Sequence, residues 1–189
     1  MNTREELVDR FQENLHRVSN YMRSVKDQND DAYRLGLEFV HSVFEDMLRQ
    51  LAIFRLEAGK YHIWSDELQL SDGRKVKFTI GELAEKYPKL TLEDLRNQAI
   101  ARKIQLETFN GSSEVVAYLK LLKFDTTKIE EFLPCLEQSI KRRHKIVHEA
   151  DLIGTPPEPN PIELNDVIHF VEAVTAVILI VLGSIDDED

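Results

Sequence analysis

The sequence of 189 residues has a single cysteine, Cys135, and few glycines and prolines, seven and six. One thiol cannot form an internal disulfide, which excludes the disulfide-rich scaffold typical of small secreted proteins. Cys135 lies in an apolar helical pattern, where a buried and inert thiol is expected. The residues from Met1 to Glu6 are mostly polar and charged, so we expect no export signal and a cytoplasmic location.

Long apolar runs and basic charge are also scarce. The apolar run 173–182, broken only by Thr175, has about half of the ~20 residues that a membrane-spanning helix needs, so we expect a buried helix and no membrane segment. The chain has 24 basic and 34 acidic residues, for a net charge of −10. This charge disfavours a broad nucleic-acid-binding surface, so any contact with a polyanion should be local.

The composition that remains, 42% hydrophobic and 31% charged, is ordinary for one globular domain, which we place at 1–189. Apolar residues recur at intervals of three and four over much of the chain, which predicts amphipathic helices. The first two helices should form an antiparallel pair. The predicted helices cover 4–26, 33 to about 54 with a stop at Gly59, 79–87, 91–108, 113–122, about 125–150, and 161 or 162 to 185.

Local signals mark the ends of these helices and the segments between them. Thr91-Leu92-Glu93-Asp94 has the spacing of a capping box, and Asp125-Thr126-Thr127 should cap the long helix that ends near Ala150. The helical period is lost from Lys60 to Thr79, where Ser71-Asp72-Gly73 between short alternating runs predicts a small β-hairpin. Four of the six prolines lie in 154–161, which predicts a stiff, extended loop. We therefore expect an all-α bundle with a mixed insertion over 60–125 and an acidic tail at 186–189.

The segment 142–151, Arg-Arg-His-Lys-Ile-Val-His-Glu-Ala-Asp, gathers the residue types that phosphate chemistry requires. Arginine stays charged and fits phosphate oxygens, and histidine transfers protons near neutral pH. Arg143 could neutralise charge that develops on a phosphodiester, while His148 could take a proton from a ribose 2′-hydroxyl or give one to the leaving 5′-oxygen. Such cleavage needs no metal or cofactor, leaves a cyclic phosphate and spares DNA.

A helical wheel relates this segment to the core. Relative to Ile140, an apolar stripe that should face the core includes Ile129, Leu133, Leu136 and Val147, and the polar side chains border it. Arg143 and His148 lie ~140° apart around the helix, which is awkward for a joint grip on one phosphate. We assign supporting roles to Asp151, which could fix the His148 tautomer, and to Glu45, which could buttress Arg143.

The pattern Arg143-x4-His148, with His144 directly after the arginine, resembles the signature of the HEPN superfamily of helical ribonucleases and nucleotide-binding domains. The string Arg-His-x-Ile-Val-His-x-x-Asp is most similar to the RiboL-PSP-type branch, and the segment 41–49 is similar to its Glu-containing second helix. The likeness covers the first helix pair and the last two long helices. It implies a HEPN-like bundle and an endoribonuclease with Arg143, His144 and His148 as catalytic residues.

The same resemblance implies a homodimer in which two motifs form one composite cleft. It also implies RNA as the substrate and a toxin–antitoxin or phage-defence setting, often beside a nucleotidyltransferase-like antitoxin. Lys141, Arg142 and Lys145 form a local basic patch that could hold a flanking phosphate; a solvated helix face is the plainer interpretation.

Other interpretations stay open at the level of sequence. His144, His148 and Asp151 could bind a metal, although no fourth ligand is evident. The motif could also belong to a non-catalytic module that binds a nucleotide, RNA or a protein, or to a purely structural protein. Tyr61 and Trp64 could stack a base but fit a core anchor better. The remaining histidines are isolated and suit surface or core positions: His16, His41, His62 and His169.

Overall fold

The computed structural model describes residues 3–25, 30–57, 104–155 and 157–185, together with positions 85, 91, 94 and 101. Of these residues 80% are helical, and the sheet that they contain has two strands of two residues each, so the all-α prediction is confirmed. The hairpin predicted at 71–73 lies outside the described residues, as do Tyr61, His62 and Trp64.

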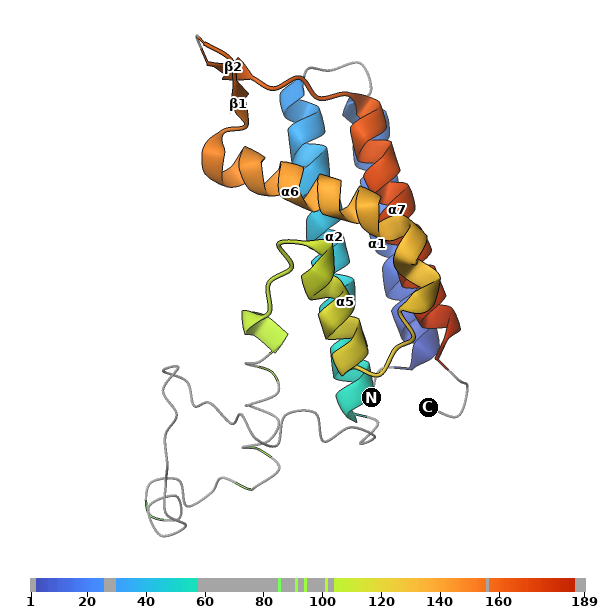
Figure 1. Ribbon diagram of the computed structural model, residues 1–189. Coiled ribbons are helices and arrows are strands. Elements are labelled where there is room, and N and C mark those ends of the chain that lie inside the picture. Colours follow the sequence, from blue (N-terminus) through green and yellow to red (C-terminus); the bar gives the residue numbers. More distant parts are fainter. Residues whose placement is uncertain are drawn as a thin grey trace.

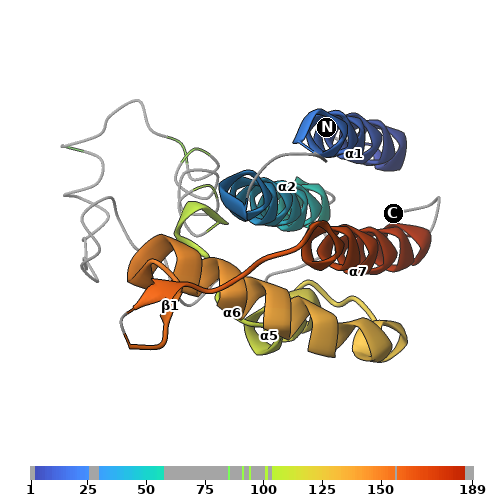
Figure 2. The ribbon, with the colours of Figure 1, turned by 90° about the horizontal axis from the view of Figure 1, so that it is seen from above.

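The first two helices are α1 (Arg4–Val25) and α2 (Asp30–Glu57), and both predictions are confirmed. They run side by side in opposite directions (Figures 1 and 2). A capping box starts α1: the Thr3 amide donates to the Glu6 carboxylate, and the Glu6 amide donates to the Thr3 hydroxyl. It satisfies donors that would otherwise be unpaired at the helix start.

The predicted long helix over about 125–150 is instead two elements, a 3-10 helix η1 (Thr127–Phe132) and an α-helix α6 (Leu133–Glu149). Pro134 explains the break. Proline lacks an amide hydrogen and its ring clashes with the carbonyl four residues earlier, so it fits only the first turn of an α-helix. Asp125 lies just before this start, and its carboxylate accepts hydrogen bonds from the Thr127 amide and hydroxyl, but the N-cap residue is Thr126, which makes no side-chain capping bond. A short helix, α5 (Ser112–Leu121), precedes this pair.

The last helix, α7 (Leu164–Gly183), begins at a capping box between Glu163 and Asp166 and packs against α1, α2, α6 and η1. It is the one helix within the described ranges that is long and apolar enough to cross a membrane. Length and composition alone are weak grounds, because the core helix of a globular domain passes the same test. Eight of its residues are buried, which is typical of a core helix: Val167, Phe170, Ala173, Val174, Val177, Ile178, Val181 and Leu182.

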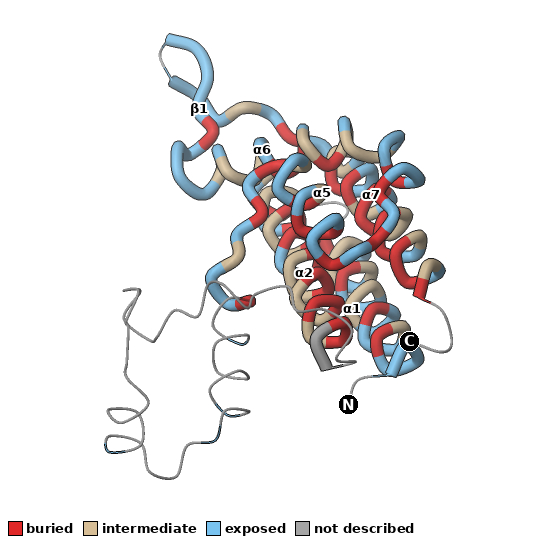
Figure 3. The backbone as a smooth tube through the Cα atoms, turned by 60° about the horizontal axis from the view of Figure 1, so that its bottom comes forward, coloured by how far each residue is buried: buried red, intermediate tan, exposed pale blue. Residues whose placement is uncertain are grey.

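Helix α6 crosses α2 and α7 obliquely, and its C-terminal turns extend beyond the bundle (Figure 1). Figure 3 shows that most of this end is exposed or only partly buried. The core stripe is therefore shorter than predicted: Leu136 and Ile140 are buried, but Val147 is 47% exposed. The wheel gives the correct angle for Val147, yet no element of the described chain covers α6 at that point.

The proline-rich loop contains a small antiparallel hairpin, formed by β1 (Leu152–Ile153) and β2 (Glu158–Pro159), rather than extended chain throughout. The Asn160 amide donates to the Asp151 carbonyl and closes it. Gly154 adopts a φ of 81°, which glycine accepts without a steric penalty. The capping box predicted at Thr91 and Asp94 is present, with reciprocal backbone-to-side-chain hydrogen bonds.

Candidate functional site

The motif covers about the last two turns of α6 and the two residues after it, where the backbone turns sharply. Ala150 and Asp151 both adopt left-handed conformations, with φ of 56° and 46°. The Asp151 amide donates to the Lys145 carbonyl and closes the helix. A non-glycine residue in this region costs roughly 1–2 kcal/mol. Other contacts must therefore hold the turn.

The main contact that holds this turn is a buried ion pair between Arg142 and Asp151. The Arg142 Nε atom lies 2.5 Å from Asp151 Oδ2, and the Asp151 side chain is 2% exposed. The Arg142 Nη2 atom also donates to the carbonyls of Asn160 and Pro161, at 2.9 and 2.8 Å. Asp151 thus fixes Arg142 and the hairpin rather than the predicted His148 tautomer. Arg142 is thus already paired inside the protein, and its role in RNA binding stays a prediction.

Arg143 points to a different neighbour, helix α2. Its Nε atom donates to Glu38 Oε2 at 2.8 Å, and the two side chains are only 22% and 24% exposed. The terminal nitrogens of Arg143 make no hydrogen bond to any residue that the structure describes. The carboxylate that supports Arg143 is therefore Glu38, two helical turns before the predicted Glu45.

Glu45 has partners of its own on α2. Its Oε2 atom accepts a hydrogen bond from Arg49 at 3.2 Å, and its Oε1 atom lies 3.9 Å from His41 Nδ1. Positions 38, 41 and 45 lie on one face of α2, since residues three and four apart share a face. This spacing of three polar side chains on one face of α2 was the signal in the sequence that could have identified Glu38.

His41 is the buried histidine of this group, with 1% of the residue exposed. Its Nε2 atom lies 3.1 Å from the Phe109 carbonyl, which can only accept, so Nε2 carries the hydrogen. The Nδ1 atom is buried and has no hydrogen-bond partner among the described residues. Burial lowers the pKa of His41; the Phe109 hydrogen bond and the charge of Glu45 oppose this effect, and the charge of Arg143 adds to it.

His144 and His148 lie one turn apart with ring centroids separated by 4.5 Å and planes inclined by 47°. His148 is exposed, whereas His144 is half-buried and its Nδ1 atom is enclosed without a described hydrogen-bond partner. One imidazole therefore faces solvent while its neighbour is ordered by packing. Of the other histidines that the structure describes, His16 and His169 are at the surface, as predicted.

The lysines of the basic patch have different environments. Lys141 Nζ lies 2.7 Å from Glu137 Oε1, and Glu137 also accepts from the Ser112 amide at 2.6 Å. These contacts lower the pKa of Glu137 to about 2, and the hydrogen bond with Lys141 has the largest effect. Lys145 is exposed and forms no ion pair with a described residue. Of the three predicted phosphate-binding cations, Lys145 is thus the one whose charge is not already paired.

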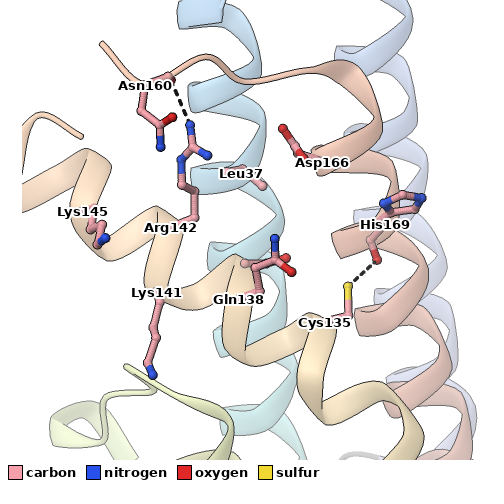
Figure 4. Close-up of a pocket in the computed structure, with 10 residues that line it drawn as sticks. Leu37, Cys135, Gln138, Lys141, Arg142, Lys145, Asn160, Asp166 and His169 are labelled. Carbon is pink, nitrogen blue, oxygen red and sulfur yellow. Dashed lines mark hydrogen bonds between the residues drawn. The ribbon is translucent and has the colours of Figure 1, made fainter. Parts of the chain in front are cut away.

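A cavity of about 320 Å³ lies between α6 and α7, over Leu37 of α2 (Figure 4). It does not include Arg143, His144 or His148. The reason is helical geometry, because Gln138, Arg142 and Lys145 share a face of α6 that is turned by ~100° or more from His144. Arg143 and His144 therefore lie on a different face of α6 from the cavity, whereas His148 lies on the same face as the lining residues Lys141 and Lys145, beyond the cavity toward the end of the helix.

Metal binding by His144, His148 and Asp151 has no geometric support, because the Asp151 carboxylate is buried against Arg142. Within the described ranges, no group of three or more His, Cys, Asp or Glu residues is placed to hold a metal ion. Cys135 is partly buried and its thiol donates to the His169 carbonyl at 3.4 Å.

Comparison with known proteins gives no relative for this chain: no family model, no curated protein and no solved structure matches it.

Proposed function

We propose that this protein is a metal-independent endoribonuclease of the HEPN type, in which Arg143, His144 and His148 act on the scissile phosphodiester. The observation that carries the proposal is the arrangement at the end of α6. The exposed imidazole of His148 lies near that of His144, with ring centroids 4.5 Å apart, and Glu38 of α2 holds the neighbouring Arg143 by its Nε atom alone. This set combines proton transfer with a fixed positive charge.

In the proposed reaction, one imidazole takes the proton of a ribose 2′-hydroxyl and the 2′-oxygen attacks the adjacent phosphorus. The bond from phosphorus to the 5′-oxygen breaks, and a protonated imidazole gives that oxygen its proton. Arg143 stabilises the charge on the nonbridging oxygens through its terminal nitrogens. The products are a 2′,3′-cyclic phosphate and a 5′-hydroxyl.

A second copy of the chain would complete the site. Arg143 and His148 are five residues apart, which is ~140° around the helix, so one helix presents them to different sides. Three exposed apolar side chains lie beside the motif: Val147, Leu152 and Ile153, at 47%, 48% and 49% exposure. Exposed apolar side chains at the end of α6 and on the adjoining strand favour a protein contact there. A homodimer through this end would place two motifs face to face.

The proposal is tested by RNA cleavage with the variants His148→Ala and Arg143→Ala. Each should lower the cleavage rate by about 100-fold or more, the usual effect of removing an acid–base group or a charge-stabilising group. His16→Ala, which removes an exposed histidine of α1, is the matched control and should cleave like the unchanged protein. The products should carry cyclic-phosphate ends, and DNA of the same sequence should stay intact.

Two results would contradict the proposal. One is cleavage that survives in both motif variants at unchanged stability. The other is cleavage that stops in excess chelator and returns with a divalent cation. A monomer at all working concentrations would contradict the composite site, and Val147→Asp should weaken the dimer if the apolar tip forms it.

A second candidate is a non-catalytic RNA-binding module. The specific observation in its favour is the ion pair between Arg143 and Glu38, which offsets part of the positive charge needed to stabilise a transition state but leaves the terminal nitrogens able to hold a phosphate. In that case RNA would bind and its affinity would fall in Arg143→Ala, but no cyclic-phosphate ends would form.

A further inference from the structure

The cavity between α6 and α7 has a local excess of positive charge in an acidic protein. Its lining includes three basic side chains, Lys141, Arg142 and Lys145, and one carboxylate, Asp166, whereas the whole chain has a net charge of −10. Asp166 is also occupied, since its Oδ2 atom accepts the Glu163 amide of the α7 capping box. Glu137 and Asp151, outside the lining, offset the charges of Lys141 and Arg142, so attraction of an anionic ligand depends on Lys145.

Lys145 is the group that would meet the charge of such a ligand. Arg142 is fixed by Asp151 and two carbonyls, and Lys141 is paired with Glu137. Lys145 has no ion pair with a described residue, and its side chain lies at the edge of the cavity in Figure 4. A phosphate at this edge would gain a charge-assisted hydrogen bond without breaking an existing pair.

The lining of the cavity also offers uncharged polar groups beside apolar side chains. The Gln138 side chain and the Oδ1 atom of Asn160 form no hydrogen bond with any described residue, and both line the cavity (Figure 4). Leu37 and Cys135 supply the apolar surface. Two carboxamides next to apolar side chains suit a flat heterocycle with donors and acceptors at its edge. The volume, about 320 Å³, is at the small end of ligand sites.

The cavity is also within reach of the motif. Lys141, Lys145 and His148 are spaced four and three residues apart, so they share one exposed face of α6. Lys145 lies only ~4.5 Å along the helix axis from His148, three residues at the α-helical rise. A strand bound at His148 would therefore pass Lys145 within one or two nucleotides.

We infer that the α6–α7 cavity receives one nucleotide of the RNA strand next to the bond cut at His148, with Lys145 contacting its phosphate and Gln138 and Asn160 contacting its base. This inference rests on the proposed function for the identity of the strand. It assigns the cavity to substrate selection, because the carboxamides would favour a base whose edge matches them.

The test measures binding of a labelled single-stranded RNA to the full-length protein, with His148→Ala as the common background so that the RNA stays intact. Lys145→Ala should weaken binding about tenfold through loss of the phosphate contact. Gln138→Trp, which fills the mouth of the cavity, should do the same without changing charge. The matched control is Lys128→Ala, an exposed lysine of η1, which should change the affinity less than about twofold.

A second measurement follows the side-chain amide resonances of Gln138 and Asn160 during titration with nucleoside 5′-monophosphates, ribose 5-phosphate and inorganic phosphate. The inference expects the nucleotides to shift both resonances at concentrations where phosphate alone does not. Equal shifts with phosphate alone would overturn it in favour of a simple anion site. Tight binding of a free nucleotide with unchanged RNA affinity in Lys145→Ala and Gln138→Trp would overturn it in favour of a small-molecule ligand.

Failure of this inference can be told apart from failure of the proposed function. If the unchanged protein cuts RNA and the cavity variants bind it like Lys128→Ala, only the cavity assignment is wrong. If no RNA is cut but the cavity variants lose RNA affinity, the nuclease proposal fails and the nucleotide site stands. All variants should show the helical circular dichroism and urea midpoint of the parent protein, which excludes unfolding as the cause.

Discussion

Replacing Asp151 with asparagine tests whether this residue stabilises the fold or assists His148. The Asp151 side chain is 2% exposed, and its partner Arg142 is 23% exposed. Removing one partner from a buried pair costs about 3–5 kcal/mol, because the remaining charge stays buried. The guanidinium of Arg142 retains two carbonyl acceptors and some contact with solvent. We therefore expect a smaller loss of about 2–3 kcal/mol in the free energy of unfolding.

The chain offers a matched control in Asp46→Asn. Asp46 also forms a pair with an arginine, Arg10, with two contacts of 2.8 Å. These side chains are 31% and 50% exposed, and such surface pairs contribute about 1 kcal/mol or less. Asparagine tolerates the left-handed backbone that Asp151 adopts, so the substitution at 151 changes charge without adding backbone strain.

Urea unfolding and thermal unfolding, both followed by circular dichroism, measure the stability of the two variants. For a protein of this length, melting temperatures should fall by about 2–4 °C for each kcal/mol, so the drop should be clearly larger for Asp151→Asn than for Asp46→Asn. Equal losses would refute the argument from burial. A normal stability with an altered pH profile of RNA cleavage would show instead that Asp151 acts on His148, as the sequence suggested.

Three further predictions concern the neighbours of the motif. Glu38→Gln should lower the turnover rate of RNA cleavage about tenfold or more because Arg143 loses its anchor, whereas Glu45→Gln should have a smaller effect. The free energy of unfolding should fall as the pH drops below about 6.5, because the lowered pKa of His41 means that the unfolded chain takes up a proton at a higher pH than the folded chain. In urea titrations at several pH values, His41→Gln should make this loss of stability at acid pH less steep. Ala150→Gly should raise the free energy of unfolding by about 0.5–1 kcal/mol, because glycine accepts the φ of 56°.

Each of these predictions has a control. Cleavage by Glu38→Gln is compared at equal stability and with kcat and KM separated, and a change in KM alone would contradict the anchoring role. If the stability of His41→Gln falls as steeply at acid pH as that of the parent protein, groups other than His41 cause the loss. Ala117 is exposed to solvent in the middle of α5, and Ala117→Gly should lower the free energy of unfolding by about 1 kcal/mol. A loss of similar size in Ala150→Gly would show that the turn is not strained.

The helices that can be read from the sequence are those whose apolar period and capping signals agree. The bounds of α1, α2, α5 and α7 follow their predicted ranges to within a few residues, because each begins with side chains that satisfy backbone donors or ends where the period stops. The α6 region shows how one residue changes this. Pro134 lies inside an apolar period that continues without interruption, so the period predicted a single helix where backbone chemistry requires a 3-10 start.

The site was harder to predict because it depends on where helices cross. Val147 has the correct angle for the core but lies beyond the point at which α2 and α7 cover α6. A helical wheel gives the angle of each residue around the helix axis but not the length over which neighbouring helices cover it, so every turn is treated as equally covered. The same limit explains why the sequence points to Glu45 and not to Glu38, since both lie on one face of α2 and only the crossing point decides which of them meets Arg143.

The two adjacent arginines of the motif show what the crossing decides in functional terms. They lie ~100° apart on α6, so one faces the hairpin and the other faces α2. Arg142 meets a carboxylate that is almost fully buried, and its hydrogen bonds bind the end of α6 to the chain that follows. Arg143 meets a carboxylate that is 24% exposed, and its terminal nitrogens make no described hydrogen bond. The charge of Arg142 is therefore offset inside the protein, whereas the charge of Arg143 is oriented and its terminal nitrogens stay available to an anion. The proposed phosphate-binding role thus fits Arg143 better than Arg142, which instead fixes the helix end that carries His148.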